Sequence, residues 1–198
     1  SSFAPHKNLL FALKAYTESG VEHLGFQFCI TGKPQKDDYS KEVKAIADNN
    51  PNVVFTGYVN EATKRQLYLN ALALVSPSLI EGFGIPVLDA ACLGMTAIAS
   101  PLGSHQEIHS MHDFDQHLLL CSTLETSDWA SAMRLTCQKQ QQALQGQSER
   151  MQQLKLNQKR HERIIRYRHY QTLIEQAFQD SVCTLIMQNS LEKAEVTT

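Results

Sequence analysis

The sequence predicts an α/β domain built on a doubly wound, parallel β-sheet of the Rossmann-like kind. Short apolar runs of strand length alternate with longer stretches whose apolar residues recur at helical spacing, a pattern typical of parallel sheets. The runs expected to form strands are 26–31, 52–56, 72–75, 95–99 and 118–121. A glycine-containing turn, 81–84, joins the third run to a helix. Because ligands of such sheets lie beyond the carboxyl ends of the strands, we expect this turn to border a site.

Three helices are expected in the first half of the chain. A loop over residues 1–8 leads into a helix from Leu9 to Ser19, which Gly20 closes. The segment 39–48 carries apolar residues at helical spacing, and Asn60 is placed to cap the helix that follows the second predicted strand. Each helix would return the chain to the start of the next parallel strand.

The second half continues the same alternation. Pro86 suits the first position of a helix that Gly94 ends. Ser104 and Glu107 have the spacing of a capping box for a short helix, and Ser127 is placed to cap another after the last strand. The sequence therefore predicts one helix after each strand of the sheet.

The last third of the chain is polar and helical in pattern. Glutamines are frequent from 138 to 158 and apolar residues interrupt them, so we expect two surface helices broken near Gly146. Basic residues from 159 to 168 alternate with apolar ones at helical spacing, which indicates the solvated face of an amphipathic helix. We assign residues 1–180 to the domain and 181–198 to a tail without an assigned role.

The first residues read as a loop before a helix, and a domain rarely begins in the middle of a loop. We therefore expect the chain to be a fragment, with at least one strand upstream of Ser1. That strand would precede the helix Leu9–Ser19 and complete the alternation of strands and helices.

Composition sets broad limits. With 198 residues, 42% hydrophobic and 19% charged, the chain suits one globular domain with a substantial core. Its net charge of −2 gives no general attraction to nucleic acid, and no apolar run is long enough to span a membrane. The five cysteines are scattered, so we interpret them as reduced residues of a cytoplasmic protein, which is either free or peripheral at the inner face of the cell membrane.

Metal ligands are not expected. His105, His109 and His112 are close in sequence, but their spacing does not place all three on one helical face. Asp37 and Asp38 form a polar pair that directly follows the polar turn 33–36, so a solvated loop is the better interpretation of them. We therefore predict neither a metal site nor a cofactor.

The turn at 81–84 has the chemistry of an anion site flanked by polyol sites. Gly82 and Gly84 let the backbone approach a ligand closely, so that the free amides of the first helical turn face it. Glu81 stands at the edge of the turn and Asp89 about one turn into the helix, where carboxylates can accept hydrogen bonds from hydroxyl groups. A phosphate between two polyols describes a sugar nucleotide.

The stretch 76–94, SPSLIEGFGIPVLDAACLG, resembles the signature of the family 4 glycosyltransferases, retaining enzymes with the two-domain GT-B fold. The motif of that family is a Glu, seven residues and a second Glu; here Glu81 is followed at that distance by Asp89. The resemblance covers residues 5–108 well and the rest loosely. It implies that the chain is the C-terminal, donor-binding half of such an enzyme, similar to mannosyltransferases, and that an N-terminal domain completes it.

The resemblance also implies a role for each site residue. Lys7 matches a lysine that contacts the donor diphosphate, Glu81 the residue that holds the transferred sugar, and Asp89 the residue that binds the ribose. The loop Gly57–Val59 would border the nucleobase, with Gly32 beside it. Lys7 and Glu81 are the implied catalytic residues. The whole implied site is Lys7, Gly32, Tyr58, Val59, Glu81, Gly82, Phe83, Gly84, Ile85 and Asp89. For Tyr58, packing against the edge of the sheet is an equal alternative.

Three functions remain open at this stage. The first is transfer of a hexose to an acceptor glycan or lipid-linked glycan, as in polysaccharide or lipopolysaccharide biosynthesis, with GDP-mannose or a UDP-sugar as the donor substrate. The second is a degenerate domain that binds no nucleotide and serves interaction, because Ser1 stands where the family often has an arginine and Asp89 where it has Glu. The third, an unrelated Rossmann-like nucleotide binder, is disfavoured because the chain has no Gly-x-Gly-x-x-Gly fingerprint.

Overall fold

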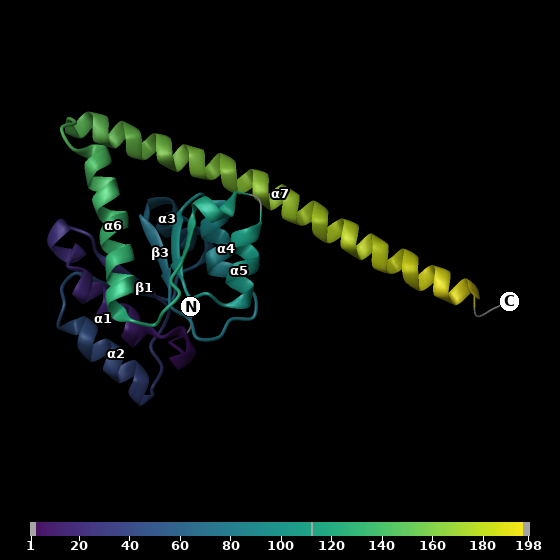
Figure 1. The fold of residues 1–198 in the computed structure, drawn as a ribbon, viewed down its shortest axis with the longest axis horizontal. Coiled ribbons are helices and arrows are strands. Elements are labelled where there is room, and N and C mark those ends of the chain that lie inside the picture. The colour runs from purple at the N-terminus through teal and green to yellow at the C-terminus, as the bar shows by residue number, and fades with distance from the viewer. Residues whose placement is uncertain (1–2, 112, 196–198) are drawn as a thin grey trace.

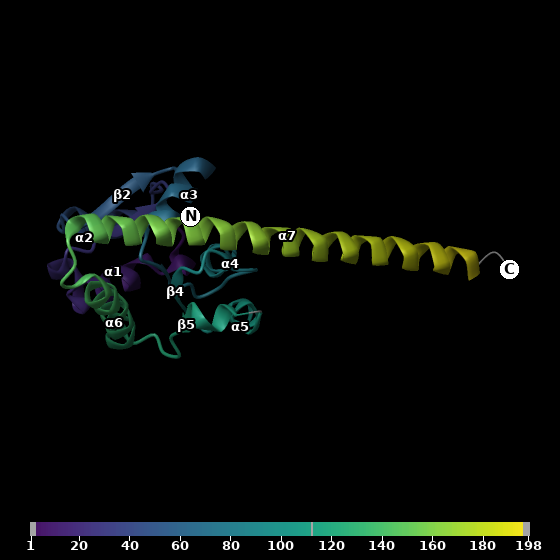
Figure 2. The same cartoon turned by 90° about the horizontal axis from the view of Figure 1, so that it is seen from above.

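The structure is a computed structural model that describes residues 3–111 and 113–195, with the side chains of the last helix described as far as Gln176. The described chain forms an α/β body, and a long helix, α7 (Glu149–Glu195), lies across this body and extends beyond it (Figures 1 and 2). His112 lies outside the described residues.

The neighbouring strands of each sheet pair in parallel, which confirms the predicted fold class, and an isolated antiparallel bridge joins Gly32 to Gly57. They form two sheets rather than one continuous sheet, with the orders β1-β2 and β3-β4-β5. The strands are β1 (Phe28–Thr31), β2 (Val53–Gly57), β3 (Ala73–Ser76), β4 (Thr96–Ala99) and β5 (Leu118–Leu120). The separation falls between β1 and β3, and residues of both strands line a cavity between the two sheets.

Helices link the strands in the order that the sequence predicts. Each strand is followed by a helix, and α1 comes before β1. The α-helices of the body are α1 (Leu9–Ser19), α2 (Asp38–Asp48), α3 (Glu61–Asn70), α4 (Ile85–Cys92), α5 (Gly103–Ser110) and α6 (Thr126–Leu144). Single 3-10 turns lie at Pro5–Lys7, Val21–Leu24 and Phe114–Gln116.

The alternation of side chains along β4 shows that the sheet is covered on both faces. Ala97 and Ala99 pack into a core cluster with residues of α4, α5 and α7. Ile98, between them, packs on the other face against Trp129 of α6 and Tyr16 of α1. Since successive residues of a strand point to opposite faces, β4 is buried on both sides, as expected for a doubly wound fold.

Of the three helix N-caps that the sequence predicts, Asn60 is confirmed and Ser104 and Ser127 are wrong, while Asp37 is a cap that was not predicted. The Asn60 side chain accepts a hydrogen bond of 2.8 Å from the Thr63 amide at the start of α3. Asp37 does the same for α2, with the Ser40 amide at 2.7 Å, so this residue of the polar pair is a cap. Ser104 and Ser127 lie inside α5 and α6 instead of capping them. Both helices begin one residue before the serine, which therefore has helical backbone and cannot occupy the cap position.

The polar C-terminal third forms two helices, as predicted, with the break at residues 145–148 around Gly146. Two arginines fix α7 to the body. Buried Arg163 donates hydrogen bonds to the carbonyls of Tyr68, Leu69 and Ala71 at the end of α3. Arg166 forms a bidentate pair with Asp113, at 2.8 Å for each hydrogen bond.

The backbone of α7 continues without a break from Asp180 to Glu195. The proposed limit of the domain at residue 180 stays a prediction. Among the helices of the described residues, none combines the length and the apolar character that crossing a membrane requires.

Candidate sugar-nucleotide site

Several loops that follow strands line one end of a cavity of about 1050 Å³, which also extends along β1 and β3 to α6 and α7. The structure brings together residues from the start of the chain, from the loops after β1, β2 and β3, and from α4. The predicted site residues that line this cavity are Lys7, Gly32, Tyr58, Val59, Glu81, Ile85 and Asp89. Gly82, Phe83 and Gly84 form the turn beside it and do not line it.

Lys7 and Glu81 form the central contact of the site. Lys7 Nζ lies 2.6 Å from Glu81 Oε1, and the same oxygen accepts a hydrogen bond of 2.8 Å from Ser78 Oγ. Asn8 has a left-handed backbone (φ 55), which asparagine tolerates better than most residues, and this bend separates the 3-10 turn that carries Lys7 from α1. The Leu79 amide donates to the His6 carbonyl at 2.8 Å and ties the two loops together.

The electrostatic surroundings of Glu81 favour its charged form. Burial acts to raise the pKa of this carboxyl, but hydrogen bonds from Lys7 and Ser78, together with the lysine charge, outweigh it and lower the pKa. The side chains of Lys7 and Glu81 are 21% and 11% exposed, so both are partly shielded while still reachable from the cavity. The pair can therefore exchange its internal contact for contacts with a ligand.

The glycine turn before α4 packs closely against the ring of His105. Gly84 has a left-handed backbone (φ +82), and a β-carbon at this position would lie 2.7 Å from Cδ2 of His105. The His105 ring is fully buried, and its Nδ1 lies 2.8 Å from the Ser100 carbonyl. Because a carbonyl oxygen only accepts hydrogen bonds, Nδ1 carries a proton, and in the neutral ring Nε2 carries none. Only glycine fits over this ring.

The N-terminus of helix α4 lies at the site. The helix begins at Ile85, with Pro86 in the second position rather than the predicted first. Pro86 has no N–H, and the amides of Val87 and Leu88 donate to the Gly84 carbonyl at 2.9 and 3.0 Å, so the Ile85 amide is the one of these four that is left for a ligand, at the positive end of the helix dipole. Both Ile85 and Lys7 line the cavity, so this amide and the Lys7 ammonium group are donors that suit an anion.

Asp89 lies on α4 with its side chain 20% exposed. Burial raises the pKa of this carboxyl, and Lys64 on α3, whose Nζ lies 3.6 Å away, offsets only part of the effect. Lys64 also pairs with Glu61 at 2.9 Å, so it stands between two carboxylates. A ligand hydroxyl at Asp89 would have Lys64 as a neighbour.

Three apolar or aromatic side chains of the site are exposed. Tyr58 is 86% exposed, so it does not pack against the edge of the sheet. Phe83 and Ile85 are 55% and 59% exposed at the mouth of the site. Exposed aromatic and aliphatic groups beside polar ones are typical of surfaces that a ligand or a second domain covers.

Sequence reasoning missed four residues that shape the site. Ser78 belongs to the quoted stretch 76–94 and Asn8 directly follows Lys7, but the role of Ser78 depends on its orientation toward Glu81 and that of Asn8 on a left-handed backbone, which the sequence does not state. His105 and Lys64 come from other elements and carry no local signal at all. Within the part of the chain that the structure describes, no group of three or more His, Cys, Asp or Glu side chains is arranged so that it could hold a metal ion.

Comparison with known proteins adds independent information. The family model of the glycosyl transferases group 1 matches residues 1–169. An uncharacterized glycosyltransferase of Methanocaldococcus jannaschii is 30% identical over 113 residues, which make up 52% of this chain and 29% of that protein. The O-antigen chain mannosyltransferase B of Escherichia coli is 28% identical over 106 residues, 52% of this chain and 28% of that protein. The chain thus spans less than a third of these relatives.

Solved structures share the fold. The pneumococcal O-GlcNAc transferase GtfA, crystallised with UDP and GlcNAc, matches 90% of this chain and 35% of its own, with a TM-score of 0.54 at 16% identity. The catalytic domain of cholesterol-α-glucosyltransferase from Helicobacter pylori matches 86% of this chain and 94% of its own, with a TM-score of 0.55 at 14% identity. AviGT4, a glycosyltransferase of avilamycin A biosynthesis, gives a TM-score of 0.53 at 17% identity, over 88% and 48% of the chains. The α/β body therefore has the fold of GT-B glycosyltransferases.

Proposed function

Because the chain belongs to the glycosyl transferases group 1 family, we propose that it is the donor-binding half of a glycosyltransferase that uses a nucleotide diphosphate sugar. The observation that carries this proposal is the pairing of Lys7 with Glu81 at 2.6 Å, beside the free N-terminus of α4. A cation and helix amides for a diphosphate lie next to a carboxylate for sugar hydroxyls.

Lys7 and the amides of Phe83–Ile85 stabilise the departing diphosphate. When the bond between the anomeric carbon and the diphosphate oxygen breaks, the oxygen keeps the electron pair and negative charge grows on the leaving group. Fixed donors aimed at that charge lower the barrier, and one such donor contributes about 2.7–4 kcal/mol in other enzymes. On this proposal no metal ion is needed for the step.

The remaining site residues bind the two ends of the donor. Glu81 accepts hydrogen bonds from hydroxyls of the transferred sugar, held in place by Ser78. Asp89 accepts from the ribose hydroxyls. Tyr58 and Val59 border the nucleobase with Gly32 beside them, and these three line the same cavity as Lys7 and Glu81.

We propose a hexose as the transferred group, retention of the anomeric configuration as in family 4, and a glycan or lipid-linked glycan as the acceptor. GDP-mannose is the first candidate donor because a relative is named a mannosyltransferase. A UDP-sugar is the second, because a structure of the same fold was crystallised with UDP. An N-terminal domain would supply the acceptor site.

Titration calorimetry of the chain with GDP, UDP, ADP and CDP, followed by the sugar nucleotides of the base that binds, tests the proposal. Selective binding of one nucleotide, with tighter binding of its sugar conjugate, is expected. In the longer enzyme, Glu81→Gln should abolish transfer while Glu42→Gln, an exposed carboxylate on α2, should not. Transfer that survives Glu81→Gln would refute the site, whereas the absence of nucleotide binding by the longer enzyme as well as by the chain would favour the degenerate interaction domain.

A further inference from the structure

Lys64 is a cation of the cavity that the donor contacts described above do not use. It lies in the first turn of α3, whose start is fixed by the Asn60 cap. The loop directly before α3 carries Tyr58 and Val59, and these two residues line the cavity together with Lys64 and Asp89. Lys64 therefore reaches from the segment expected at the nucleobase to the carboxylate expected at the ribose.

Lys64 and Asp89 face each other without closing a direct hydrogen bond. Lys64 Nζ lies 3.6 Å from Asp89 Oδ2, whereas hydrogen bonds between ammonium and carboxylate groups are about 2.7–2.9 Å long. The ammonium group also meets Glu61 Oε2 at 2.9 Å. Since an ammonium group carries three N–H donors and Glu61 takes one, donors remain for a ligand that binds at Asp89.

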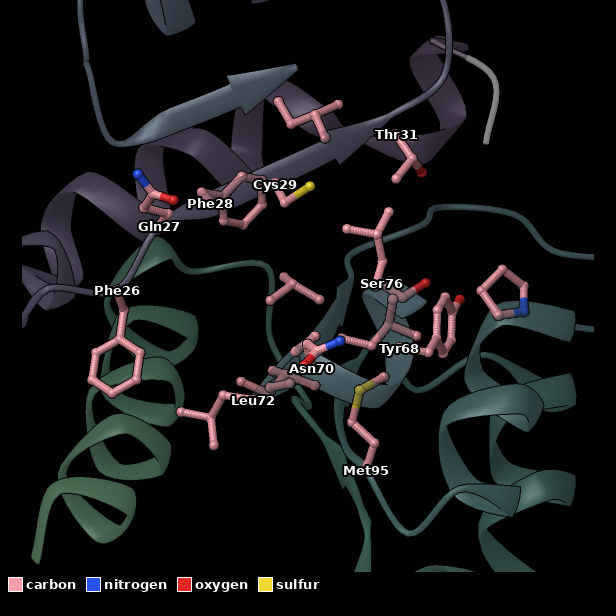
Figure 3. Close-up of a pocket in the computed structure, with 18 of the residues that line it drawn as sticks. Phe26, Gln27, Phe28, Cys29, Thr31, Tyr68, Asn70, Leu72, Ser76 and Met95 are labelled. Carbon is pink, nitrogen blue, oxygen red and sulfur yellow. The ribbon is translucent and has the colours of Figure 1, made fainter. Parts of the chain in front are cut away.

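The pair lies in a partly shielded region of the cavity. Tyr68, one turn further along α3, lines the same cavity and packs against the core (Figure 3). The pKa of Tyr68 is raised, first by burial and then by the charge of Asp89, so its hydroxyl lies within electrostatic range of this carboxylate. Because hydrogen bonds are stronger where water is partly excluded, a hydrogen bond gained or lost at this pair should change ligand affinity measurably.

The chemistry of the pair suits a ribose. The 2′- and 3′-hydroxyls of ribose are neighbours on one face of the ring, and each can donate one hydrogen bond and accept others. The Asp89 carboxylate only accepts and the Lys64 ammonium group only donates. One hydroxyl can therefore satisfy both groups, whereas a sugar that lacks this hydroxyl leaves both without a ligand partner.

We propose that Lys64 donates a hydrogen bond to a ribose hydroxyl that itself donates to Asp89, and that the two residues together select ribonucleoside diphosphates over their deoxy forms. The inference rests on the proposed function, because it takes the cavity as the donor site. It adds a specificity residue from α3 to those that the stretch 76–94 supplies. If Lys64 served only to tie α3 to α4 through its ion pair with Asp89, its loss would not change this selection.

Titration calorimetry with GDP, UDP and the 2′-deoxy and 3′-deoxy forms of each tests the selection. The parent chain should bind the ribonucleotide about tenfold more tightly than at least one deoxy form. Lys64→Met should weaken the ribonucleotide by about the same factor and leave that deoxy form unchanged, because the deoxy form never made the contact. Arg65→Met, which removes the exposed neighbouring cation of α3, is the matched control and should change none of these affinities.

The outcomes separate this inference from the proposed function. If the nucleotides bind and Lys64→Met weakens the ribonucleotide and both deoxy forms equally, or weakens none of them, the inference alone is wrong. If no nucleotide binds to the chain or to the longer enzyme, the proposed function fails and the inference fails with it.

A measurement without any nucleotide tests the contact itself. The Lys64 charge acts to lower the pKa of Asp89 against the effect of burial. Lys64→Met should therefore raise the pKa of Asp89 further, as followed by NMR titration of its side-chain carboxyl carbon, and Arg65→Met should leave it as in the parent. A pKa of Asp89 that is the same in Lys64→Met and the parent would place the ammonium group away from the carboxylate and overturn the proposal.

Discussion

Lys7 Nζ and Glu81 Oε1 lie 2.6 Å apart, although the two residues are 74 positions apart in the chain. Each is expected to bind a different part of the donor, Lys7 the diphosphate and Glu81 the transferred sugar. In the structure, the Lys7 ammonium group therefore takes the place of the sugar hydroxyls at Glu81, and the Glu81 carboxylate takes the place of the diphosphate at Lys7. Donor binding on this account is an exchange, in which two internal contacts are replaced by contacts with one molecule, so little binding energy is spent on desolvating isolated charges.

The two carboxyls of the site should have opposite effects on stability as the pH changes. The pKa of Glu81 is lowered, so its interactions stabilise the fold at neutral pH and this contribution is lost as the pH falls through the lowered pKa. The pKa of Asp89 is raised, so its charged form destabilises the fold at neutral pH and protonation relieves this cost as the pH falls.

We therefore expect Glu81→Gln to lower the midpoint of thermal unfolding at pH 7 by about 2 °C or more and Asp89→Asn to raise it by a similar amount. Both differences from the parent should shrink when the scans are repeated at about pH 4, near the ordinary carboxyl pKa. Shifts of the same sign in the two variants would contradict these electrostatic assignments.

Substitution of the two glycines of the turn should have unequal effects. Gly84→Ala combines a left-handed backbone with a β-carbon 2.7 Å from the His105 ring, and we expect it to reduce the free energy of unfolding by about 2–4 kcal/mol. Gly82→Ala is the matched control, because nothing lies within 4 Å of its β-carbon and its φ is not left-handed. Chemical denaturation of both variants measures the difference, and equal losses would mean that the packing against His105 does not constrain the turn.

Arg163 should be the main attachment of α7. Its guanidinium group is buried and satisfies three carbonyls at the end of α3, so Arg163→Met leaves buried acceptors without donors. We expect a loss of about 2–3 kcal/mol in the free energy of unfolding. Arg160→Met, on the same helix with its guanidinium bonded only to Asn157 on the surface, should cost less than about 0.5 kcal/mol. Urea unfolding followed by circular dichroism compares them, and similar losses would argue against the buried anchor.

Much of the fold could be predicted because local signals and tertiary structure agree. Gly20 and Gly94 adopt the left-handed conformation expected after α1 and α4, and the Asn60 cap forms as predicted. The failures at Ser104 and Ser127 have a common cause. Cap preference identifies a residue type but not the first helical residue, and both helices begin two positions earlier than caps at these serines would place them.

The residues of the candidate site could be predicted because they follow the ends of parallel strands. The contacts between their side chains could be predicted only in part. The rule for parallel sheets places Lys7, Gly32, Tyr58 and Glu81 at one edge, and they do line one cavity. The rule does not show that Lys7 and Glu81 pair, that Ser78 holds the same carboxylate, or that Lys64 reaches Asp89 from α3. These contacts depend on how α3 and the first loop pack, which no local pattern encodes.

Calorimetric titration of three proteins with a nucleoside diphosphate and with its sugar conjugate tests the central claim most directly. The proteins are the parent chain, Lys7→Ala and Glu81→Gln, with Lys14→Ala on the exposed face of α1 as a control. Lys7→Ala should weaken both ligands by about tenfold to a hundredfold, because one charged hydrogen bond to the diphosphate is lost. Glu81→Gln should weaken only the sugar conjugate and leave the nucleoside diphosphate bound equally or more tightly, because it releases Lys7. If Glu81→Gln weakens both ligands to the same extent, or if Lys7→Ala weakens neither, the division of the donor between these two residues is wrong.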